Sequence, residues 1–452
     1  MYRNLRKSLT RTTATALIAG LLVSTTTLSG ALAAPGVDTP NKSEEPYDIV
    51  ILGDSLAVGY ELGFTEKSIP YGFGEHVYEQ ALFNGYRAEY SNYGILGLRS
   101  DGLNNWISAA STGKSVTDAD IQPNIPDPRV KTIVAKTKQL EADLKEAELI
   151  LLSIGANDFL QLVGMMNLNT EFSGLPQTKQ DELKSTLATL LDTFSIELEE
   201  TLTAIHKLQP NAEVVISNQY LPIPSLILKE KVTYLIPDST ALFLLDVQDQ
   251  LLKKLEGVIA KLTSKGLTIK IADSATGIEK NVMTNTSIGA KDSEGNSKPD
   301  SHPTAAGYAV MGKAYTEALW GDYKTVQPRK SNVPISVVVE GKEIITTYSP
   351  IIKKGRTFIA IADITDALGA TRSWNGSTNT ATIKLGGRTV EITIGAKTIK
   401  VNGESLPLNA EPAYLQQFTG EKKTYVPLAA LSEGLGLQVT YRDTIKTAFI
   451  NN

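Results

Sequence analysis

The feature that most limits the possible folds is a regular alternation of strand-like and helix-like segments between Tyr47 and Trp320. The strand-like runs are DIVILG, AEYSNYG, ELILLSIG, AEVVISNQ and LTIKIAD. Amphipathic stretches typical of helices occur between and after them, at residues 74–83, 130–147, 179–208, 240–264 and 304–320. Short β-rich strands separated by helices predict an α/β fold in three layers, with a parallel sheet covered by helices on both faces. Ligands of such folds bind outside the carboxyl ends of the strands, so functional residues are expected there.

The first 33 residues have the three zones of a secretory signal peptide. A basic start that includes Arg3 and Arg11 precedes an apolar stretch at residues 14–23, about half of the ~20 residues that a membrane span needs. Residues 31–33, Ala-Leu-Ala, then place small side chains at the −3 and −1 positions that signal peptidase reads. We therefore expect cleavage after Ala33, export of the protein, no transmembrane segment, and a proline-containing linker at residues 34–46.

The chain contains no cysteine and only three histidines, His76, His206 and His302. The absence of cysteine excludes disulfides, a thiol nucleophile and thiolate zinc or iron–sulfur sites, and we expect neither a metal nor a cofactor. His206 lies near the end of one predicted helix and His76 on another, so both are expected to be structural. Removing the four positive charges of the leader changes the formal net charge from −5 to −9, which disfavours nucleic acid and anionic lipid surfaces as partners. An exported protein without cysteine is typical of a Gram-positive bacterium.

A second polar, proline-bearing connector at residues 321–334 marks a domain boundary, beyond which short β-rich segments alternate with Gly and Asn turns. The region that follows, residues 335–452, contains an internal repeat. Residues 355–374 align without gaps on residues 422–441, at an offset of 67 residues. Each copy has the pattern of a hairpin, a short helix ending at glycine, and a strand. We therefore predict a small β-rich α+β domain of two related units, following a first domain at residues 47–320.

Four short blocks follow predicted strands of the first domain. The block GDSL, residues 53–56, comes directly after DIVIL and places a serine hydroxyl where a strand opens into a helix or loop. The block NYGILG, residues 92–97, contains glycines that let a backbone N–H approach a ligand. The block GAND, residues 155–158, offers a side-chain amide, and DSHP, residues 300–303, leads into the last helix. The four blocks thus place polar groups at one edge of the predicted sheet.

Acyl transfer to a serine requires a base for the hydroxyl proton, a group that orients the base, and donors for the oxyanion that develops on the carbonyl. Ser55 is the candidate nucleophile, His302 the candidate base and Asp300 the candidate orienting group. The oxyanion hole is expected from the N–H of Ser55, the N–H of Gly97 and the side-chain amide of Asn157. The chain has no G-x-S-x-G, which excludes the nucleophile elbow of α/β-hydrolases.

On these four ordered blocks, residues 47–320 resemble the SGNH or GDSL hydrolase family, and among its members the secreted bacterial lipases and acylhydrolases. The resemblance implies a flavodoxin-like three-layer α/β/α sandwich. It also implies the roles named above for Ser55, Gly97, Asn157 and His302.

The position of the acidic residue departs from the family pattern. The family usually carries an aspartate three residues before the histidine, where this chain has Pro299, whereas Asp300 lies two residues before His302. In an extended segment, residues two apart project to the same side, so Asp300 can still reach the imidazole. Either Asp300 or a backbone carbonyl is therefore expected to orient His302.

The C-terminal region resembles the stalk-type module named after the N-terminal domain of copper amine oxidases, which occurs in many exported proteins of Gram-positive bacteria. The stretch from Pro334 to Asn452 has no His, Cys or Met with which to bind copper. A role in cell-wall or surface attachment, or as a spacer, is therefore expected.

These features predict a secreted serine esterase or lipase that hydrolyses short to medium acyl esters through an acyl-serine intermediate. Two apolar loop stretches after predicted strands, residues 159–166 and 221–228, either line an acyl pocket or fill the core. One alternative is an O-acetyl esterase that acts on cell-wall or extracellular polysaccharide, because the same machinery removes acetyl groups from sugars. The other is a non-enzymatic surface- or matrix-binding protein with a degenerate hydrolase domain.

Overall fold

The first region is built on a five-stranded sheet in which every neighbouring pair of strands is parallel. Its strands are β1 (Tyr47–Gly53), β2 (Ala88–Asn92), β3 (Leu149–Ser153), β4 (Glu213–Ser217) and β7 (Ile269–Ala272). They lie in the order β2-β1-β3-β4-β7. Numbered within the sheet, this is the order 2-1-3-4-5 of flavodoxin-like folds, which confirms the predicted architecture. The carboxyl end of β1 is the point where the strand order reverses, the usual ligand position of such sheets.

The computed structural model describes residues 46–221, 223, 225–228 and 231–452. The expected signal peptide and nearly all of the first expected linker lie outside these residues.

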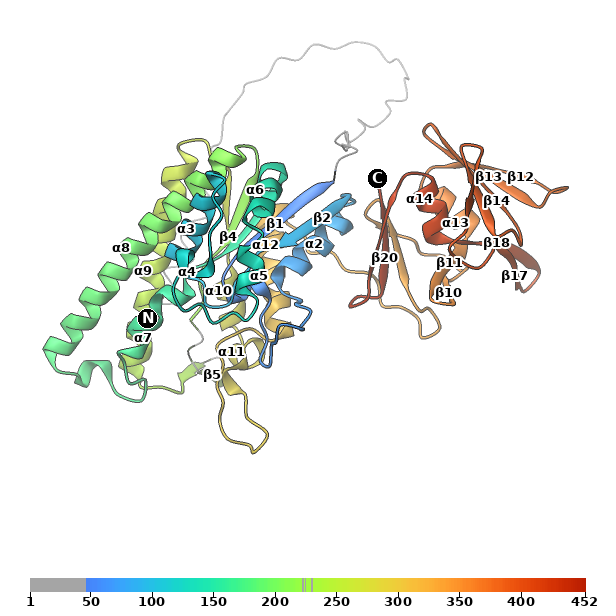
Figure 1. Ribbon diagram of the computed structural model, residues 1–452. Coiled ribbons are helices and arrows are strands. Elements are labelled where there is room, and N and C mark those ends of the chain that lie inside the picture. The colour runs from blue at the N-terminus through green and yellow to red at the C-terminus, as the bar shows by residue number, and fades with distance from the viewer. Residues whose placement is uncertain (1–45, 222, 224, 229–230) are drawn as a thin grey trace, which may run out of the picture. The chain divides into compact units, whose positions relative to one another are not determined.

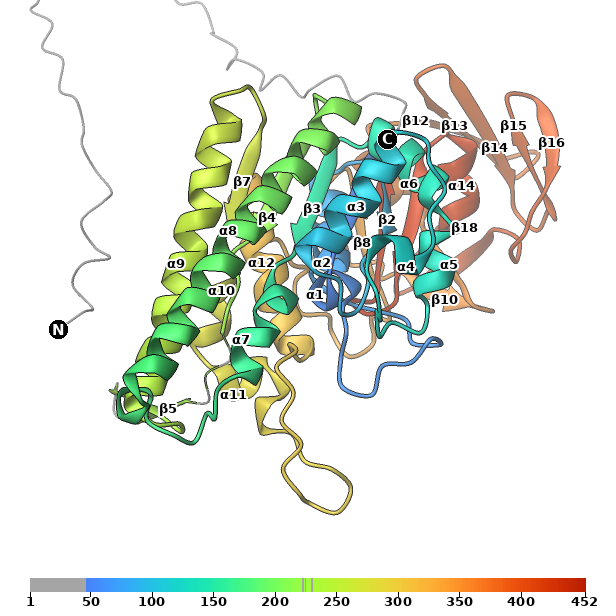
Figure 2. The ribbon, with the colours of Figure 1, turned by 60° about the vertical axis from the view of Figure 1, so that its left-hand side comes forward.

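Side chains that alternate along the central strands separate two hydrophobic clusters. Ile49 and Ile51 of β1 belong to one cluster, and Val50 and Leu52 belong to the other. The first cluster packs against α2 (Phe73–Phe83), α10 (Ser274–Glu279) and α12 (Ala305–Trp320). The second packs against α3 (Ser100–Ser111), α6 (Thr137–Glu146), α8 (Gln177–Leu208) and α9 (Asp238–Thr263). Helices therefore cover both faces of the sheet, as Figures 1 and 2 show.

Shorter elements lie in the connections of the first region. They are α1 (Ser55–Val58), α4 (Asp118–Ile121), α5 (Val130–Val134), η2 (Ala156–Phe159), α7 (Leu160–Gly164), η3 (Phe172–Gly174), α11 (Val282–Asn285) and η4 (Ser287–Gly289). Several of them follow the carboxyl ends of strands and surround the expected site.

Several elements differ from the sequence-based expectations. The pattern does not predict α3, whose glycine and two asparagines have low helix propensity, but the fully buried Trp106 anchors it against the sheet. The helix expected at residues 130–147 is two helices, because the backbone of Lys136 leaves helical geometry between α5 and α6. Apolar loops were expected at residues 159–166 and 221–228, but the first contains α7, and in the second β5 (Ser225–Leu228) pairs antiparallel with β6 (Lys231–Tyr234).

The C-terminal region is β-rich with two short helices, as predicted. One sheet contains β10 (Ile351–Lys353), β11 (Arg356–Ala360), β18 (Glu421–Pro427) and β17 (Tyr414–Phe418). A second contains β12 (Thr371–Asn375), β13 (Thr380–Leu385), β14 (Arg388–Thr393), β15 (Thr398–Val401) and β16 (Glu404–Pro407). The third contains β19 (Gln438–Arg442), β20 (Thr447–Asn451), β8 (Ser336–Val339) and β9 (Lys342–Glu343).

The two repeat copies meet in the first of these sheets. β11 pairs antiparallel with β18, and Ile359 lies opposite Val426, its equivalent at the repeat offset. Each strand leads into a short helix, α13 (Ile361–Ala367) after β11 and α14 (Leu428–Gly434) after β18. Two related units are thus paired about a local twofold axis.

Residues 321–334 join α12 to β8 without a helix or strand. Val338 of β8 and Phe449 of β20 nevertheless belong to the same hydrophobic cluster as α2, and the two regions form one compact unit. The boundary between two domains therefore stays a prediction. Among the described helices, none is long and apolar enough to cross a membrane.

Candidate active site

Ser55 begins α1, directly after the carboxyl end of β1. The turn depends on Gly53, whose φ of 133° disfavours other residues and whose Cβ, if present, would lie 1.9 Å from the carbonyl oxygen of Ser153. Asp54 caps the helix, because its side chain accepts a 3.0 Å hydrogen bond from the Leu56 N–H. The strand-to-helix turn thus holds the Ser55 hydroxyl at the expected edge of the sheet.

His302 lies in the loop that connects η4 to α12. The Ser287 N–H donates to the His302 carbonyl over 2.9 Å, and the Asp300 N–H donates to the Ser287 carbonyl over 3.1 Å. Thr304 caps α12 with its hydroxyl. Contacts on both sides of the imidazole therefore fix the loop next to α1, although 247 positions separate His302 from Ser55.

Ser55, His302 and Asp300 form one hydrogen-bonded chain. His302 Nε2 is 2.8 Å from Ser55 Oγ, and His302 Nδ1 is 2.5 Å from Asp300 Oδ1. The same Asp300 oxygen accepts from the backbone N–H of His302 over 2.9 Å, which orients the carboxylate toward the ring despite the two-residue spacing. The hydrogen bond from the imidazole holds the pKa of Asp300 below its ordinary value. This arrangement can take a proton from Ser55 and stabilise the imidazolium that results.

The three groups expected in the oxyanion hole line the same pocket as His302. Among the described residues, neither the N–H of Ser55 nor that of Gly97 has an acceptor. Gly97 has a φ of 80°, in the left-handed region that favours glycine. The Asn157 amide donates one hydrogen bond to the Leu98 carbonyl over 2.9 Å and has a second N–H to offer. The pocket has a volume of about 700 Å³.

Asp158 joins the two loops that carry these donors. Its carboxylate accepts from the backbone N–H of Ser100 over 3.1 Å and also from the Ser100 hydroxyl. Ser100 begins α3, shortly after Gly97, and Asp158 follows Asn157 in η2. Burial raises the pKa of Asp158 to about 6. Asp158 was not among the predicted site residues, although it directly follows Asn157 in the GAND block and its position there could have indicated a role at the site.

The pocket is lined by both apolar and polar side chains. The apolar residues are Leu96, Pro123, Pro126, Leu160 and Leu190. The polar residues other than those already described are Arg99, Asp101, Gln122, Asn124, Gln161 and Thr193. Arg99 forms an ion pair of 2.8 Å with Asp101, so the two charges compensate each other.

The two apolar stretches expected near the site have different positions. In residues 159–166, Leu160 lines the pocket, whereas Phe159 and Leu162 are buried in the core. This stretch therefore both lines the pocket and fills the core. In residues 221–228, Leu221 and Ile223 pack in a separate small cluster with the start of α9, and the side chains from 224 onward lie outside the described residues.

The other two histidines do not line this pocket. His76 is buried on α2, where its Nδ1 is 3.1 Å from the Tyr323 hydroxyl, and burial lowers its pKa to about 4. His206 lies in the last turn of α8.

A family model described as GDSL-like lipase/acylhydrolase matches residues 49–315, more than half of the chain. The chain belongs to this family. The GDSL hydrolase is thus a carboxylic ester hydrolase. A second family model, described as copper amine oxidase N-terminal domain, matches residues 338–450. The comparison with curated proteins found no match.

Several solved structures are similar to the GDSL hydrolase. The lipase Lip_vut3 from a goat rumen metagenome is 15% identical, with a TM-score of 0.36, over 61% of this chain and 99% of that chain. Phospholipase A1 from Streptomyces albidoflavus NA297 is 14% identical, with a TM-score of 0.34, over 60% of this chain and 100% of that chain. A family 3 carbohydrate esterase from Clostridium thermocellum is 12% identical, with a TM-score of 0.32, over 61% of this chain and 95% of that chain.

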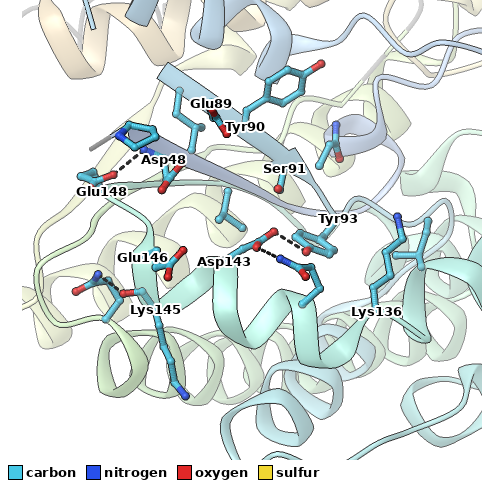
Figure 3. Close-up of a pocket in the computed structure, with 17 residues that line it drawn as sticks. Asp48, Glu89, Tyr90, Ser91, Tyr93, Lys136, Asp143, Lys145, Glu146 and Glu148 are labelled. Carbon is cyan, nitrogen blue, oxygen red and sulfur yellow. Dashed lines mark hydrogen bonds between the residues drawn. The ribbon is translucent and has the colours of Figure 1, made fainter. Parts of the chain in front are cut away.

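The GDSL hydrolase also has a larger cavity, of about 1030 Å³, along β2 and α6 (Figure 3). Its lining includes the carboxylates Asp48, Glu89, Asp143, Glu146 and Glu148. Burial, and then the charge of Glu148, raise the pKa of Asp48 to about 6. None of the predicted site residues lines this cavity, and within the described part of the chain no cluster of acidic residues or histidines has the arrangement of a metal site.

Asp54 of the GDSL hydrolase is a fully buried carboxyl group. One of its oxygens caps α1, and the other has no hydrogen-bond partner among the described residues. Burial raises the pKa of Asp54 from its ordinary value of 3.8 to about 7. The folded protein therefore binds a proton at Asp54 more tightly than the unfolded chain does.

We expect this group to make stability depend on pH. The stabilisation from proton binding is complete below about pH 4 and is lost as the pH rises through about 7. Between pH 4 and 8, the free energy of unfolding of the wild type should fall relative to that of Asp54→Asn by on the order of a few kcal/mol. Urea unfolding of both proteins at several pH values measures this difference in the free energy of unfolding. A change in stability that the asparagine causes equally at every pH does not alter how the difference depends on pH. Parallel pH profiles would contradict a raised pKa at Asp54.

Proposed function

We propose that this GDSL hydrolase cleaves carboxylic esters through a covalent acyl-serine at Ser55. The observation that carries the proposal is the hydrogen-bonded chain of Ser55, His302 and Asp300 at the pocket that Gly97 and Asn157 also line. A hydroxyl, an imidazole and a carboxylate in this order meet the requirements of nucleophilic acyl transfer.

In the first half of the reaction, His302 Nε2 takes the hydroxyl proton while Ser55 Oγ attacks the carbonyl carbon of the ester. The N–H groups of Ser55 and Gly97 and the Asn157 amide stabilise the oxyanion of the tetrahedral intermediate. The bond between the carbonyl carbon and the alcohol oxygen then breaks, and the imidazolium gives its proton to the leaving alcohol. Asp300 accepts the hydrogen bond from Nδ1 and keeps the ring oriented throughout.

In the second half, water takes the place of the alcohol. His302 removes a proton from the water as its oxygen attacks the acyl carbon. The bond between the acyl carbon and Ser55 Oγ breaks, and Oγ regains its proton from His302. The carboxylic acid leaves, and the enzyme returns to its starting state without a cofactor.

The pocket lining supports an acyl chain of short to medium length. Leu96, Pro126 and Leu190 line the same pocket as Ser55, and so does Leu160, which is 61% exposed. An acyl chain that covers these side chains gains about 25 cal/mol for each Å² of apolar surface removed from water. The volume of about 700 Å³ is within the usual range for small-molecule sites.

A series of 4-nitrophenyl esters tests this proposal on the full chain. We expect the highest kcat/KM with acyl groups of about four to eight carbons, because each buried methylene contributes about 0.8 kcal/mol. Leu160→Ser should lower kcat/KM for the octanoate about fivefold and leave the acetate nearly unchanged. The matched control is Leu242→Ser, since Leu242 on α9 is equally exposed, at 61%, but does not line the pocket. Equal losses for acetate and octanoate, or for both variants, would rule out an acyl site at Leu160.

The polar part of the lining favours a second candidate substrate. Gln122, Asn124, Gln161 and Thr193 offer donors and acceptors of the kind that bind sugar hydroxyls. An O-acetylated polysaccharide is therefore the alternative to an acyl-chain ester. A higher kcat/KM for acetyl release from an acetylated glycan than for every 4-nitrophenyl ester would select it.

We also propose that the enzyme is exported and that its C-terminal region attaches it to the cell surface. The support is the signal-peptide pattern of the first 33 residues and the match of residues 338–450 to the copper amine oxidase N-terminal domain.

A further inference from the structure

Strands of the C-terminal region pack against α2 of the first region. The ring of Phe449 in β20 meets Phe83 edge to face, with centroids 4.8 Å apart. The side-chain amide of Asn451, which is 1% exposed, donates to the carbonyls of Leu82 and Tyr86 over 3.0 and 2.9 Å. A buried amide that donates to two backbone carbonyls, one in α2 and one in the turn after it, fixes the position of β20 relative to α2. The C-terminal region therefore makes specific contacts with the first region, which carries the active site.

Arg442, the last residue of β19, forms a buried ion pair across this contact. Its Nε is 2.9 Å from Glu79 Oε1 on α2, and the two side chains are 18% and 3% exposed. The guanidinium also lies 5.2 Å from the ring centroid of Tyr78. Glu79 Oε2 accepts a 2.7 Å hydrogen bond from the Tyr71 hydroxyl. Glu79 is thus the shared partner of a cation from the C-terminal region and a hydroxyl from the loop before α2.

That loop, residues 59–72, connects the helix of Ser55 to α2 and is drawn in blue in Figure 2. The backbones of its two ends are in contact. A Cβ on Gly72 would lie only 2.7 Å from Gly59 Cα. Much of the loop between these ends is open to solvent, and Ile69 near its second end is 94% exposed. Phe64 contacts the guanidinium of Arg129, at 4.8 Å from the ring centroid. The hydrogen bond of the Tyr71 hydroxyl is thus one of the contacts that hold this loop.

Tyr60, at the start of the same loop, contacts the imidazole of the active site. The ring centroids of Tyr60 and His302 are 4.3 Å apart, and the Tyr60 carbonyl accepts a 2.7 Å hydrogen bond from the Tyr308 hydroxyl. Because the ends of the loop are in contact, a restraint on Tyr71 at one end also limits the movement of Tyr60 at the other. The contacts run from Arg442 through Glu79 to Tyr71, and the backbone of Gly72, next to Tyr71, approaches that of Gly59, next to Tyr60.

We propose that Arg442 is a positioning residue, which the C-terminal region supplies to the active site of the first region. Through Glu79 and Tyr71 it holds the 59–72 loop so that Tyr60 packs against His302. The C-terminal region thus contributes to catalysis in addition to any role in attachment. The inference rests on the proposed function, in which His302 is the base.

The test uses the full chain and two variants of the contact. Arg442→Gln removes the cation, and Tyr71→Phe removes only the hydroxyl that donates to Glu79 and keeps the ring. The control is Arg372→Gln, because Arg372 pairs with Asp366 inside the C-terminal region. Two quantities are measured at a temperature where all proteins are folded: kcat and KM for 4-nitrophenyl butyrate, and hydrogen exchange of the peptide that covers residues 59–72.

Both contact variants should lower kcat about fivefold or more with a smaller change in KM, since misplacement of a group by about 1 Å can cost 100-fold in rate. Both should also speed hydrogen exchange in the 59–72 loop, and Arg442→Lys should recover part of each effect. The Arg372→Gln control should match the wild type in both measurements.

An unchanged kcat in Arg442→Gln and Tyr71→Phe would overturn the proposal, whether or not loop exchange rises. Equal exchange in the variants, the control and the wild type would overturn it as well, because the loop would then not depend on this contact. Failure of the proposed function gives a different result, namely a wild type that neither hydrolyses the ester nor is labelled at Ser55 by a fluorophosphonate.

Discussion

Replacing Ser55 with alanine is expected to lower kcat for a 4-nitrophenyl ester by at least about 10,000-fold. Without the hydroxyl, no acyl-serine forms, and only direct attack by water on the bound ester, assisted by the oxyanion hole, remains. The substitution removes a single oxygen whose described partner is His302 Nε2, at 2.8 Å. The cap on α1 comes from Asp54, so the helix should form as before.

The control for Ser55→Ala is a second buried serine at the same edge of the sheet. Ser217 ends β4, and its hydroxyl is 3.2 Å from that of Ser153, outside the pocket that Ser55 lines. Ser217→Ala should retain the wild-type kcat, and both variants should have similar far-UV circular dichroism. Activity of folded Ser55→Ala within tenfold of the wild type would show that another group is the nucleophile.

Asp300→Asn is expected to lower kcat by about 1,000-fold with little change in KM. The wild-type carboxylate accepts two hydrogen bonds at one oxygen, from the backbone N–H and from Nδ1 of His302. A neutral asparagine cannot stabilise the imidazolium that forms when Ser55 loses its proton, and its amide can favour the wrong tautomer of the ring. The loss should therefore occur in the transition state and not in substrate binding.

The matched control is Glu294→Gln, which removes a carboxylate from the exposed part of the loop that precedes Asp300. This variant should hydrolyse esters at the wild-type rate. A kcat for Asp300→Asn within about threefold of the wild type would mean that Asp300 does not orient the base. The alternative that the sequence left open, a backbone carbonyl, would then be favoured.

The sheet of the first region was predictable because the pattern of apolar residues that indicates its strands and helices is local and occurs several times along the chain. Buried runs such as that of β1 are apolar on both faces, and the long helices α8 and α9 show the helical period over many turns. The carboxyl ends of parallel strands meet at one edge, so blocks far apart in the chain were expected to meet there. Ser55 and His302 do lie at hydrogen-bond distance, and their catalytic roles stay a prediction.

Other features depend on contacts that a local pattern does not contain. α3 forms in spite of weak helix propensity because Trp106 is fully buried, which is a tertiary effect. The reach of Asp300 to His302 depends on the backbone between η4 and α12, where the Ser287 contacts fix the loop. The ion pair of Arg442 with Glu79 joins residues 363 positions apart, and neither residue belongs to a recognisable block.

Labelling of the full chain with a fluorophosphonate, followed by mass spectrometry of its peptides, shows directly whether Ser55 is the nucleophile. A serine oxygen that His302 activates attacks phosphorus and displaces fluoride, whereas an ordinary serine hydroxyl does not react. We expect one adduct per molecule, on the peptide that contains Ser55, together with loss of esterase activity. An active protein without an adduct, or with an adduct on any other residue, would mean that Ser55 is not the nucleophile.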